Sequence, residues 1–149
     1  MKPFPDTEEI LVEFFAETGG QLPTETEQEK LISWIESVVT QRNCQLTGLN
    51  YVFCDDSYLH KINVEYLQHD TLTDIITFPM ESPPVVAGDI FISTERVADN
   101  AKDLDIPYET ELRRVIIHGV LHLCGQGDKT AAEATEMRRQ EDWALSLLG

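Results

Sequence analysis

Residues 115–128 read Val-Ile-Ile-His-Gly-Val-Leu-His-Leu-Cys-Gly-Gln-Gly-Asp. His118 and His122 are four residues apart, so a helix would place both imidazoles on one face, close enough to bind one ion. A glycine-rich turn follows and brings back Asp128 as a possible third ligand. Three protein ligands leave a coordination position open, as in catalytic metal sites, whereas structural sites usually have four ligands rich in cysteine. The stretch therefore predicts a metal site on a central, apolar helix.

The histidine pair also has a purely structural interpretation. Two histidines at this spacing on an apolar helix are often packed, hydrogen-bonded side chains, and the pair alone leaves both interpretations open. The Gly-x-Gly-Asp turn favours metal binding, because a tight turn can return a third ligand to the ion. Gly119 stands where the H-E-x-x-H motif of zinc peptidases has its general-base glutamate, which disfavours peptidase chemistry. Imidazole and carboxylate ligands suit Zn²⁺, so we expect one zinc ion per chain.

The segments around this helix predict an α+β fold with a single small mixed sheet. β-Branched and aromatic residues predict about four strands, at residues 9–16, 48–54, 74–78 and 89–93. Helical spacing and capping residues predict about five helices, at residues 24–43, 55–67, 94–103, 108–124 and 130–148. The inward positions of the last helix are expected to be Ala134, Met137, Trp143 and Leu147. Its acidic residues are expected to face solvent: Glu133, Glu136, Glu141 and Asp142.

The composition is that of one soluble globular domain covering residues 1–149. Hydrophobic residues make up 42% of the chain and charged residues 26%, as in ordinary soluble domains. No apolar run approaches the roughly 20 residues that span a bilayer, and the first residues lack the apolar core of a signal peptide. The three cysteines, Cys44, Cys54 and Cys124, form no C-x-x-C pair. We therefore expect a cytoplasmic protein with reduced thiols and no membrane partner.

The formal net charge of −16 is unfavourable for binding nucleic acids, because an acidic surface repels a polyanion. The basic residues are unevenly distributed, however: seven of the eleven lie from Arg96 onward. Arg113, Arg114 and Lys129 flank the histidine motif itself. A local basic rim on an acidic body is therefore one interpretation, and charges that merely face solvent are the other.

Two upstream segments accompany the histidine motif. The first runs from Ile62-Asn63 through Tyr66 and Asp70 to Thr73-Asp74-Ile75-Ile76-Thr77-Phe78-Pro79, and the second is Gly88-Asp89-Ile90-Phe91-Ile92-Ser93. In order and spacing, these segments and residues 118–128 resemble the YbeY family of metal-dependent endoribonucleases, whose histidine motif is H-G-x-L-H-L-x-G-x-D-H. The resemblance covers residues 50–128 and is much more specific than the histidine pair alone.

The resemblance implies a small α+β fold in which three ligands bind one zinc ion at the end of a cleft. It also implies hydrolysis of single-stranded ribosomal RNA, in maturation of the 3′ end of 16S rRNA and in ribosome quality control. The partners would be this RNA and the small ribosomal subunit, not DNA. His118 and His122 correspond to the first two ligands and to the catalytic centre. The third family histidine falls on Asp128, so the expected metal ligands are two histidines and one aspartate.

The chain departs from the family pattern at a second position. The arginine that follows the tyrosine in the upstream segment is Leu67 here. A guanidinium fork can bind a phosphate through two hydrogen bonds, and leucine cannot. Arg113, Lys129, Arg114 or Lys61 could supply the missing positive charge from another direction.

Several other residues are candidates for binding the substrate. Asn63, Thr73 and Asp74 are expected to line the cleft together with Arg113 and Lys129, although capping and turn formation are an equal alternative for Thr73 and Asp74. A further set has both a functional and a structural interpretation. Tyr51 and Tyr66 could stack on bases or pack in the core, Asp89 could support a histidine or end a turn, and Cys54 and Cys124 are expected in the core.

Two functions from other classes remain open. One is a ribosome-binding or protein-binding factor with a structural metal or none, in which Leu67 marks lost nuclease activity. The other is a metal-dependent hydrolase of a non-RNA substrate such as a small amide or ester, which the acidic surface favours and the motifs disfavour.

Overall fold

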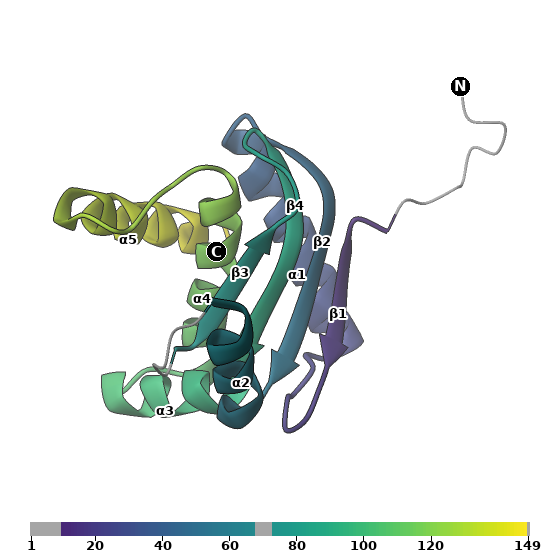
Figure 1. Cartoon of the computed structure of the whole chain (residues 1–149). Coiled ribbons are helices and arrows are strands. Elements are labelled where there is room, and N and C mark those ends of the chain that lie inside the picture. Colours follow the sequence, from purple (N-terminus) through teal and green to yellow (C-terminus); the bar gives the residue numbers. More distant parts are fainter. Residues whose placement is uncertain (1–9, 68–72, 149) are drawn as a thin grey trace, which may run out of the picture.

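A four-stranded sheet with helices on both faces forms the framework of the protein (Figure 1). The structure is a computed structural model that describes residues 10–67 and 73–148. Its strands are β1 (Val12–Ala16), β2 (Gln45–Cys54), β3 (Ile75–Pro79) and β4 (Val85–Ser93). Its helices are α1 (Glu25–Gln41), α2 (Asp56–Leu67), α3 (Thr94–Leu104), α4 (Tyr108–Leu123) and α5 (Ala131–Ser146).

The sheet is mixed and has the strand order β1-β2-β4-β3. β1 pairs with β2 and β2 with β4 in parallel, whereas β3 pairs antiparallel with β4. β3 is therefore an edge strand. The predicted α+β class, with one small mixed sheet and the candidate metal residues on a helix, is confirmed. Residue 9 and Asp70, which belonged to predicted segments, lie outside the described residues.

β2 and β4 both begin earlier than the sequence predicted. β2 starts at Gln45 instead of residue 48, and β4 starts at Val85 instead of residue 89. The two extensions pair with each other, since Gln45 is in register with Val85, and the Gln45 N–H donates to the Pro84 carbonyl at 2.8 Å. Pairing with a neighbouring strand thus extends each strand beyond its β-rich segment, because strand formation depends on its partner more than on local preference.

The main core lies between the sheet and α1 and α4, and α2 covers the opposite face (Figure 1). α4 is the central helix of this core and is apolar on most sides. Its buried hydrophobic residues are Leu112, Val115, Ile116, Ile117, Val120, Leu121 and Leu123. Burying each such side chain stabilises the fold by about 1.5–3 kcal/mol. The helix that carries the two histidines is therefore held rigidly against the sheet.

Gly119 allows α4 to approach the sheet closely. A Cβ atom at this position would lie 2.8 Å from Ile90 Cδ1 and 3.1 Å from Ile75 Cδ1. The position faces β3 and β4 and is buried. It therefore has no room for the glutamate that zinc peptidases carry there, which gives a packing reason for the incomplete peptidase motif.

The C-terminal helix α5 contacts the body through a narrower strip than predicted. Met137 is buried and Trp143 packs against the core as expected, but Ala134 and Leu147 are exposed, so these two predictions are wrong. The inward strip consists of Met137, Glu141 and Ala144, spaced by four and three residues. The indole N–H of Trp34 donates to the Ala144 carbonyl at 2.7 Å and fastens the end of α5 to α1. In the two described ranges, no helix has the length and apolarity that crossing a membrane requires.

Candidate metal centre

His118, His122 and Asp128 converge at one point beside α4. Asp128 Oδ2 lies 3.3 Å from His118 Nε2 and 3.2 Å from His122 Nε2. The two imidazole rings are 4.6 Å apart between centroids, with planes at 85°. All three potential ligand atoms lie within 4.8 Å of one another, so the group could hold a metal ion.

The two separations that involve Asp128 fit a small tetrahedral ion. Ligand atoms about 2.0–2.1 Å from a tetrahedral Zn²⁺ are about 3.3 Å apart. The two separations between imidazole nitrogen and carboxylate oxygen are close to this value. The three side chains are also partly exposed, with 22%, 31% and 37% of His118, His122 and Asp128 accessible. A fourth ligand from solvent or substrate could therefore reach the ion.

A tight turn after α4 delivers Asp128. The helix ends at Leu123, and Gly125 adopts a φ of +106°, a conformation that favours glycine. The N–H groups of Gly125 and Gln126 donate to the carbonyls of His122 and Leu121, both at 2.9 Å, and close the end of the helix. α5 then begins after Thr130, whose side chain and that of Glu133 form a reciprocal capping box. Asp128 is thus held between two well-defined helix ends.

Glu141 of α5 contacts the far side of His118, a role that the sequence did not predict. Its Oε2 lies 2.6 Å from His118 Nδ1, and only 5% of the residue is exposed, so the prediction that Glu141 faces solvent is wrong. The overlooked signal is its position four residues after Met137, on the inward strip of the helix. A carboxylate that receives the second ring N–H of a metal-binding histidine is a common supporting interaction.

Electrostatic interactions shift the pKa values of both His118 and Glu141. Burial by itself lowers the pKa of His118, but the hydrogen bond and charge of Glu141, with the charges of Asp128 and Asp74, raise it above its usual value. Burial favours a higher pKa for Glu141, yet its hydrogen bonds to His118 and Arg114 hold the pKa below the usual value. In the absence of metal, the pair therefore favours an imidazolium–carboxylate contact.

A cleft of about 940 Å³ opens in front of the three ligands. Its wall is formed by β3, the C-terminal half of α2, the end of α4 and the turn before α5. Asn63, Thr73, Asp74, Thr77 and Lys129 line it, and substrate binding by the predicted residues among them stays a prediction. Asn63 is only 3% exposed, so it offers the cleft little more than the edge of its amide.

Arg113 lies elsewhere. Its Nη2 pairs with Glu27 of α1 at 3.4 Å, and it is absent from the described lining of the cleft. Arg113 precedes His118 by five positions, about 140° around the helix, so it points away from the ligand face. The structure therefore does not bring Arg113 together with the other predicted substrate-binding residues.

Lys129 is the sole lysine or arginine among the described residues that line the cleft. Leu67, at the position of the family arginine, also lines it and brings no charge. Arg114 is held by Glu141 at 3.0 Å and by Asp142 at 2.8 Å, and Lys61 lies beside Glu65 outside the cleft. Of the four candidates to replace the arginine, only Lys129 has a suitable position.

Two further acidic residues lie beside the centre, Glu111 buried and Asp74 partly exposed. Asp74 and Glu111 line a second, smaller cavity of about 170 Å³ behind His118, together with Glu141 and two arginines. Burial raises the pKa of Asp74, and burial together with the charge of Asp74 raises that of Glu111. Glu111 Oε1 is buried and has no hydrogen-bond partner within the described part of the chain.

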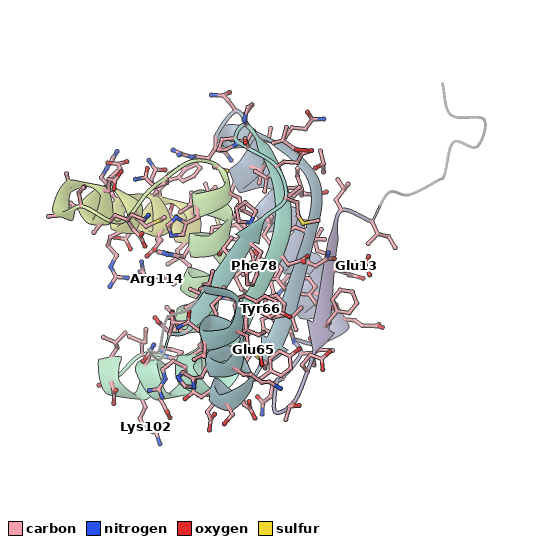
Figure 2. All side chains as sticks on the ribbon, viewed as in Figure 1. Glu13, Glu65, Tyr66, Phe78, Lys102 and Arg114 are labelled. Carbon is pink, nitrogen blue, oxygen red and sulfur yellow. The ribbon has the colours of Figure 1, made fainter. Side chains whose placement is uncertain are left out.

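Three residues with two interpretations can now be assigned. Tyr51 is fully buried and donates its hydroxyl to the Ile116 carbonyl at 3.1 Å, so it packs in the core. Tyr66 is 69% exposed and meets Phe78 edge-on, where α2 crosses β3 (Figure 2). Asp89 accepts a hydrogen bond from Asn50 at 3.1 Å, and Glu141 instead contacts the histidine. Cys54 is buried as predicted, whereas Cys124 is half-buried at the edge of the core.

Comparison with known proteins identifies the family. The family model described as Endoribonuclease YbeY matches residues 16–149. The chain belongs to the YbeY family. The Endoribonuclease YbeY of Flavobacterium johnsoniae is 47% identical over 137 residues, which cover 92% of this chain and 96% of that relative. The Amoebophilus asiaticus relative is 53% identical over 112 residues, 74% of this chain and 76% of the relative.

A solved structure has a similar fold. The solution structure of a Thermotoga maritima protein matches with a TM-score of 0.67 and 24% sequence identity, covering 92% of this chain and 88% of that protein. The expected family and the expected enzyme class, an endoribonuclease, are thereby confirmed by the YbeY relatives. The His118–His122–Asp128 group is consistent with a metal-dependent member of this class.

Proposed function

We propose that the protein is a zinc-dependent endoribonuclease that cleaves single-stranded ribosomal RNA in the cytoplasm. In this proposal it acts on the small ribosomal subunit, where it matures the 3′ end of 16S rRNA and takes part in ribosome quality control. The observation that carries the proposal is the convergence of two imidazoles and a carboxylate in an open cleft, with both separations from the carboxylate close to those around a tetrahedral ion. Family membership supports the RNA substrate.

The donor set supports zinc. Two neutral imidazoles and one carboxylate are ligands that zinc and other borderline first-row ions accept. A zinc ion held there would act as a Lewis acid on the phosphodiester and would make a coordinated water more acidic. Asp128 replaces a neutral histidine of the family pattern, so it would add one negative charge and weaken both effects somewhat.

The remaining residues of the cleft would bind and orient the RNA. Lys129 is suited to contact a phosphate oxygen, because it lies on the cleft wall beside Asp128. Thr73, just before β3, and Thr77 of β3 can exchange hydrogen bonds with the ribose and the phosphate, whereas the nearly buried Asn63 offers them little surface. Asp74 is half-exposed, acidic and near the centre, so it would keep a second phosphate at a distance unless it is protonated.

The test compares metal content and RNA cleavage in the wild type, His118→Ala and Asp128→Ala, with His60→Ala of α2 as a histidine control outside the cleft. We expect about one zinc per chain and cleavage of a single-stranded RNA from the 16S 3′ region, with both lost in the two site variants only. A DNA strand of the same sequence should stay intact. Equal cleavage by wild type and Asp128→Ala would contradict the proposed site.

Leu67→Arg distinguishes the nuclease from the binding factor. If Leu67 merely lowers phosphate affinity, the wild type cleaves and the variant lowers KM, because a guanidinium fork enters the cleft. If wild type binds zinc but cleaves nothing while the variant cleaves, the natural chain is a binding factor. Turnover of a small ester or amide without RNA cleavage would indicate the non-RNA hydrolase.

A further inference from the structure

We propose that Glu141 is the positioning residue of the metal centre, and that it couples docking of the C-terminal helix α5 to metal binding. The inference rests on the proposed metal site but not on the RNA substrate. Its basis is the 2.6 Å contact between Glu141 Oε2 and His118 Nδ1. Glu141 comes from a helix that contributes no ligand itself.

The contact determines which nitrogen of His118 is free. An ionised carboxylate can only accept hydrogen bonds, so the Nδ1 of His118 must carry the proton. In a neutral ring, Nε2 then has its lone pair available, and Nε2 is the atom that faces Asp128 at 3.3 Å. Glu141 thereby selects the tautomer that can bind the ion and fixes the plane of the ring.

Glu141 can do this because its own position is well defined. It is 5% exposed, and its Oε1 accepts from Arg114 of α4 at 3.0 Å while its Oε2 faces His118. Arg138 adds a longer contact of 3.5 Å to Oε1. Both carboxylate oxygens thus have partners, as a buried charge requires. Movement of the carboxylate would break hydrogen bonds on two sides.

The same contact links α5 to the metal. α5 meets the body through a narrow strip, in which Met137 and Ala144 are apolar and Glu141 supplies the polar link to His118. Metal binding at Nε2 makes the Nδ1–H of His118 a stronger donor, which strengthens its bond to Glu141. Coupling between two equilibria is reciprocal, so metal should stabilise docked α5 and docked α5 should raise the metal affinity.

Asp142 offers a matched control. It follows Glu141 directly, carries the same charge and accepts from the same Arg114 at 2.8 Å. Its side chain is 60% exposed and has no recorded contact with His118. Asp142→Asn therefore removes an equal charge from the same helix and weakens one of the hydrogen bonds of Arg114, but leaves the histidine contact intact.

The first measurement is zinc affinity, by competition with a chelator, for wild type, Glu141→Gln, Glu141→Ala and Asp142→Asn. Loss of a supporting carboxylate typically lowers metal affinity about 10- to 100-fold, which we expect for Glu141→Ala. The zinc affinity of Glu141→Gln should lie between those of wild type and Glu141→Ala, because the glutamine amide oxygen still accepts a hydrogen bond but has no charge. Asp142→Asn should stay close to wild type. Unchanged affinity in a folded Glu141→Ala protein would overturn the positioning role.

The second measurement is hydrogen exchange of the α5 amides with and without zinc. In wild type and Asp142→Asn, zinc should increase protection of residues 131–146. In Glu141→Ala this increase should disappear, even with zinc at saturation. An equal increase in Glu141→Ala would show that α5 is coupled by another route and would overturn the coupling.

These readouts separate the inference from the proposed function. Zinc binding that depends on Glu141, with no RNA cleavage, would support the inference and contradict the nuclease. RNA cleavage, with a zinc affinity that does not depend on Glu141, would support the nuclease and contradict the inference. A wild-type protein that binds no zinc would overturn both.

Discussion

At the residue scale, one buried carboxylate beside the metal centre, that of Glu111, contacts none of the three candidate ligands. Glu111 is 6% exposed, and its Oε1 lacks a partner among the described residues. The charged groups around it are Asp74, Glu141, Arg114 and Arg138. A buried carboxylate without full hydrogen bonding is costly when ionised. Residues beside the centre thus carry a stability cost that a surface carboxylate does not.

Replacing Glu111 by glutamine should stabilise the protein in a pH-dependent way. Burial raises the pKa of Glu111 above the usual 4.5, so the folded state binds its proton more tightly than the unfolded state. Stability is then lost as the pH rises from about 4.5 through the raised pKa, and stays lost above it. We expect Glu111→Gln to raise the free energy of unfolding by about 1 kcal/mol at pH 7, with no gain near pH 4.

Chemical denaturation of metal-free protein across this pH range measures the effect. Glu109→Gln is the matched control, because Glu109 also lies in the first turn of α4 but is exposed. The change in stability of Glu109→Gln measures the loss of a favourable negative charge near the N-terminus of a helix. Glu111→Gln loses the same kind of charge. A stability difference between the variants that is the same at pH 4 and pH 7 would contradict the burial argument.

At the scale of elements, α4 is the helix on which the site depends, and it packs tightly against the sheet at Gly119. Glycine in a helix interior costs about 1 kcal/mol relative to alanine. The gain is a contact in which Ile90 and Ile75 occupy the space of the absent Cβ. Close packing at this point holds the ligand face of α4 beside the edge strand β3. Residues of α4 and of β3 therefore line the same cleft.

Gly119→Ala should therefore destabilise the protein despite the better helix propensity of alanine. The new Cβ would lie 2.8 Å from Cδ1 of Ile90, which is fully buried, and overpacking of this kind costs about 1–3 kcal/mol. In an Ile90→Val background, which lacks Cδ1, the substitution should cost less, with the contact to Ile75 Cδ1 at 3.1 Å remaining. Urea unfolding of the four proteins in this double-mutant cycle gives the coupling energy. Stabilisation by Gly119→Ala alone would refute the close-packing argument.

α2 presents an exposed aromatic ring one residue before Leu67 of the cleft, and this ring should contribute to RNA binding. Tyr66 is 69% exposed and precedes Leu67, which lines the cleft. Stacking of a base on an exposed aromatic ring contributes about 1–3 kcal/mol. Tyr66→Ala should weaken binding of single-stranded RNA accordingly, and Tyr66→Phe, which keeps the ring, should not.

Fluorescence anisotropy in a non-cleaving His118→Ala background measures this binding. Val64→Ala serves as a control for an exposed apolar residue two positions away on the same helix. Equal weakening by Tyr66→Ala and Val64→Ala would indicate a general effect on α2, not stacking.

At the scale of the whole molecule, the acidic surface limits how RNA can be held. The formal net charge is −16, and Lys129 is the sole lysine or arginine in the described lining of the cleft. Few phosphates can be neutralised, so few counterions are released on binding. Affinity must then depend on the metal, on stacking and on hydrogen bonds more than on the charge of the protein.

The salt dependence of RNA binding should consequently be shallow. Each neutralised phosphate of a single strand contributes a slope of about −0.7 to the logarithm of affinity against the logarithm of salt. We expect a wild-type slope between about −0.7 and −1.4. Lys129→Ala should reduce its magnitude by about 0.7, whereas Lys102→Ala, the same charge change on α3, should not. A steep slope that is insensitive to Lys129 would place the phosphate contacts elsewhere.

Local sequence determined the part of the site that depends on neighbouring residues. The spacing of His118 and His122 places them on one helix face, since backbone hydrogen bonding sets 3.6 residues per turn wherever a helix forms. The glycine-rich turn returns Asp128 within six residues of His122. Most helix boundaries followed from capping residues in the same way.

Only the tertiary structure decided which distant residues meet this local site. Glu141 is 23 residues from His118 and reaches it because α5 packs against α4 along one narrow strip. Arg113 is close to His118 in sequence but lies on another side of the helix, against Glu27. Likewise, the early start of β2 and β4 depends on their pairing with each other. Such contacts arise from packing between elements, and the periodicity of one element carries no information about the partner it will meet.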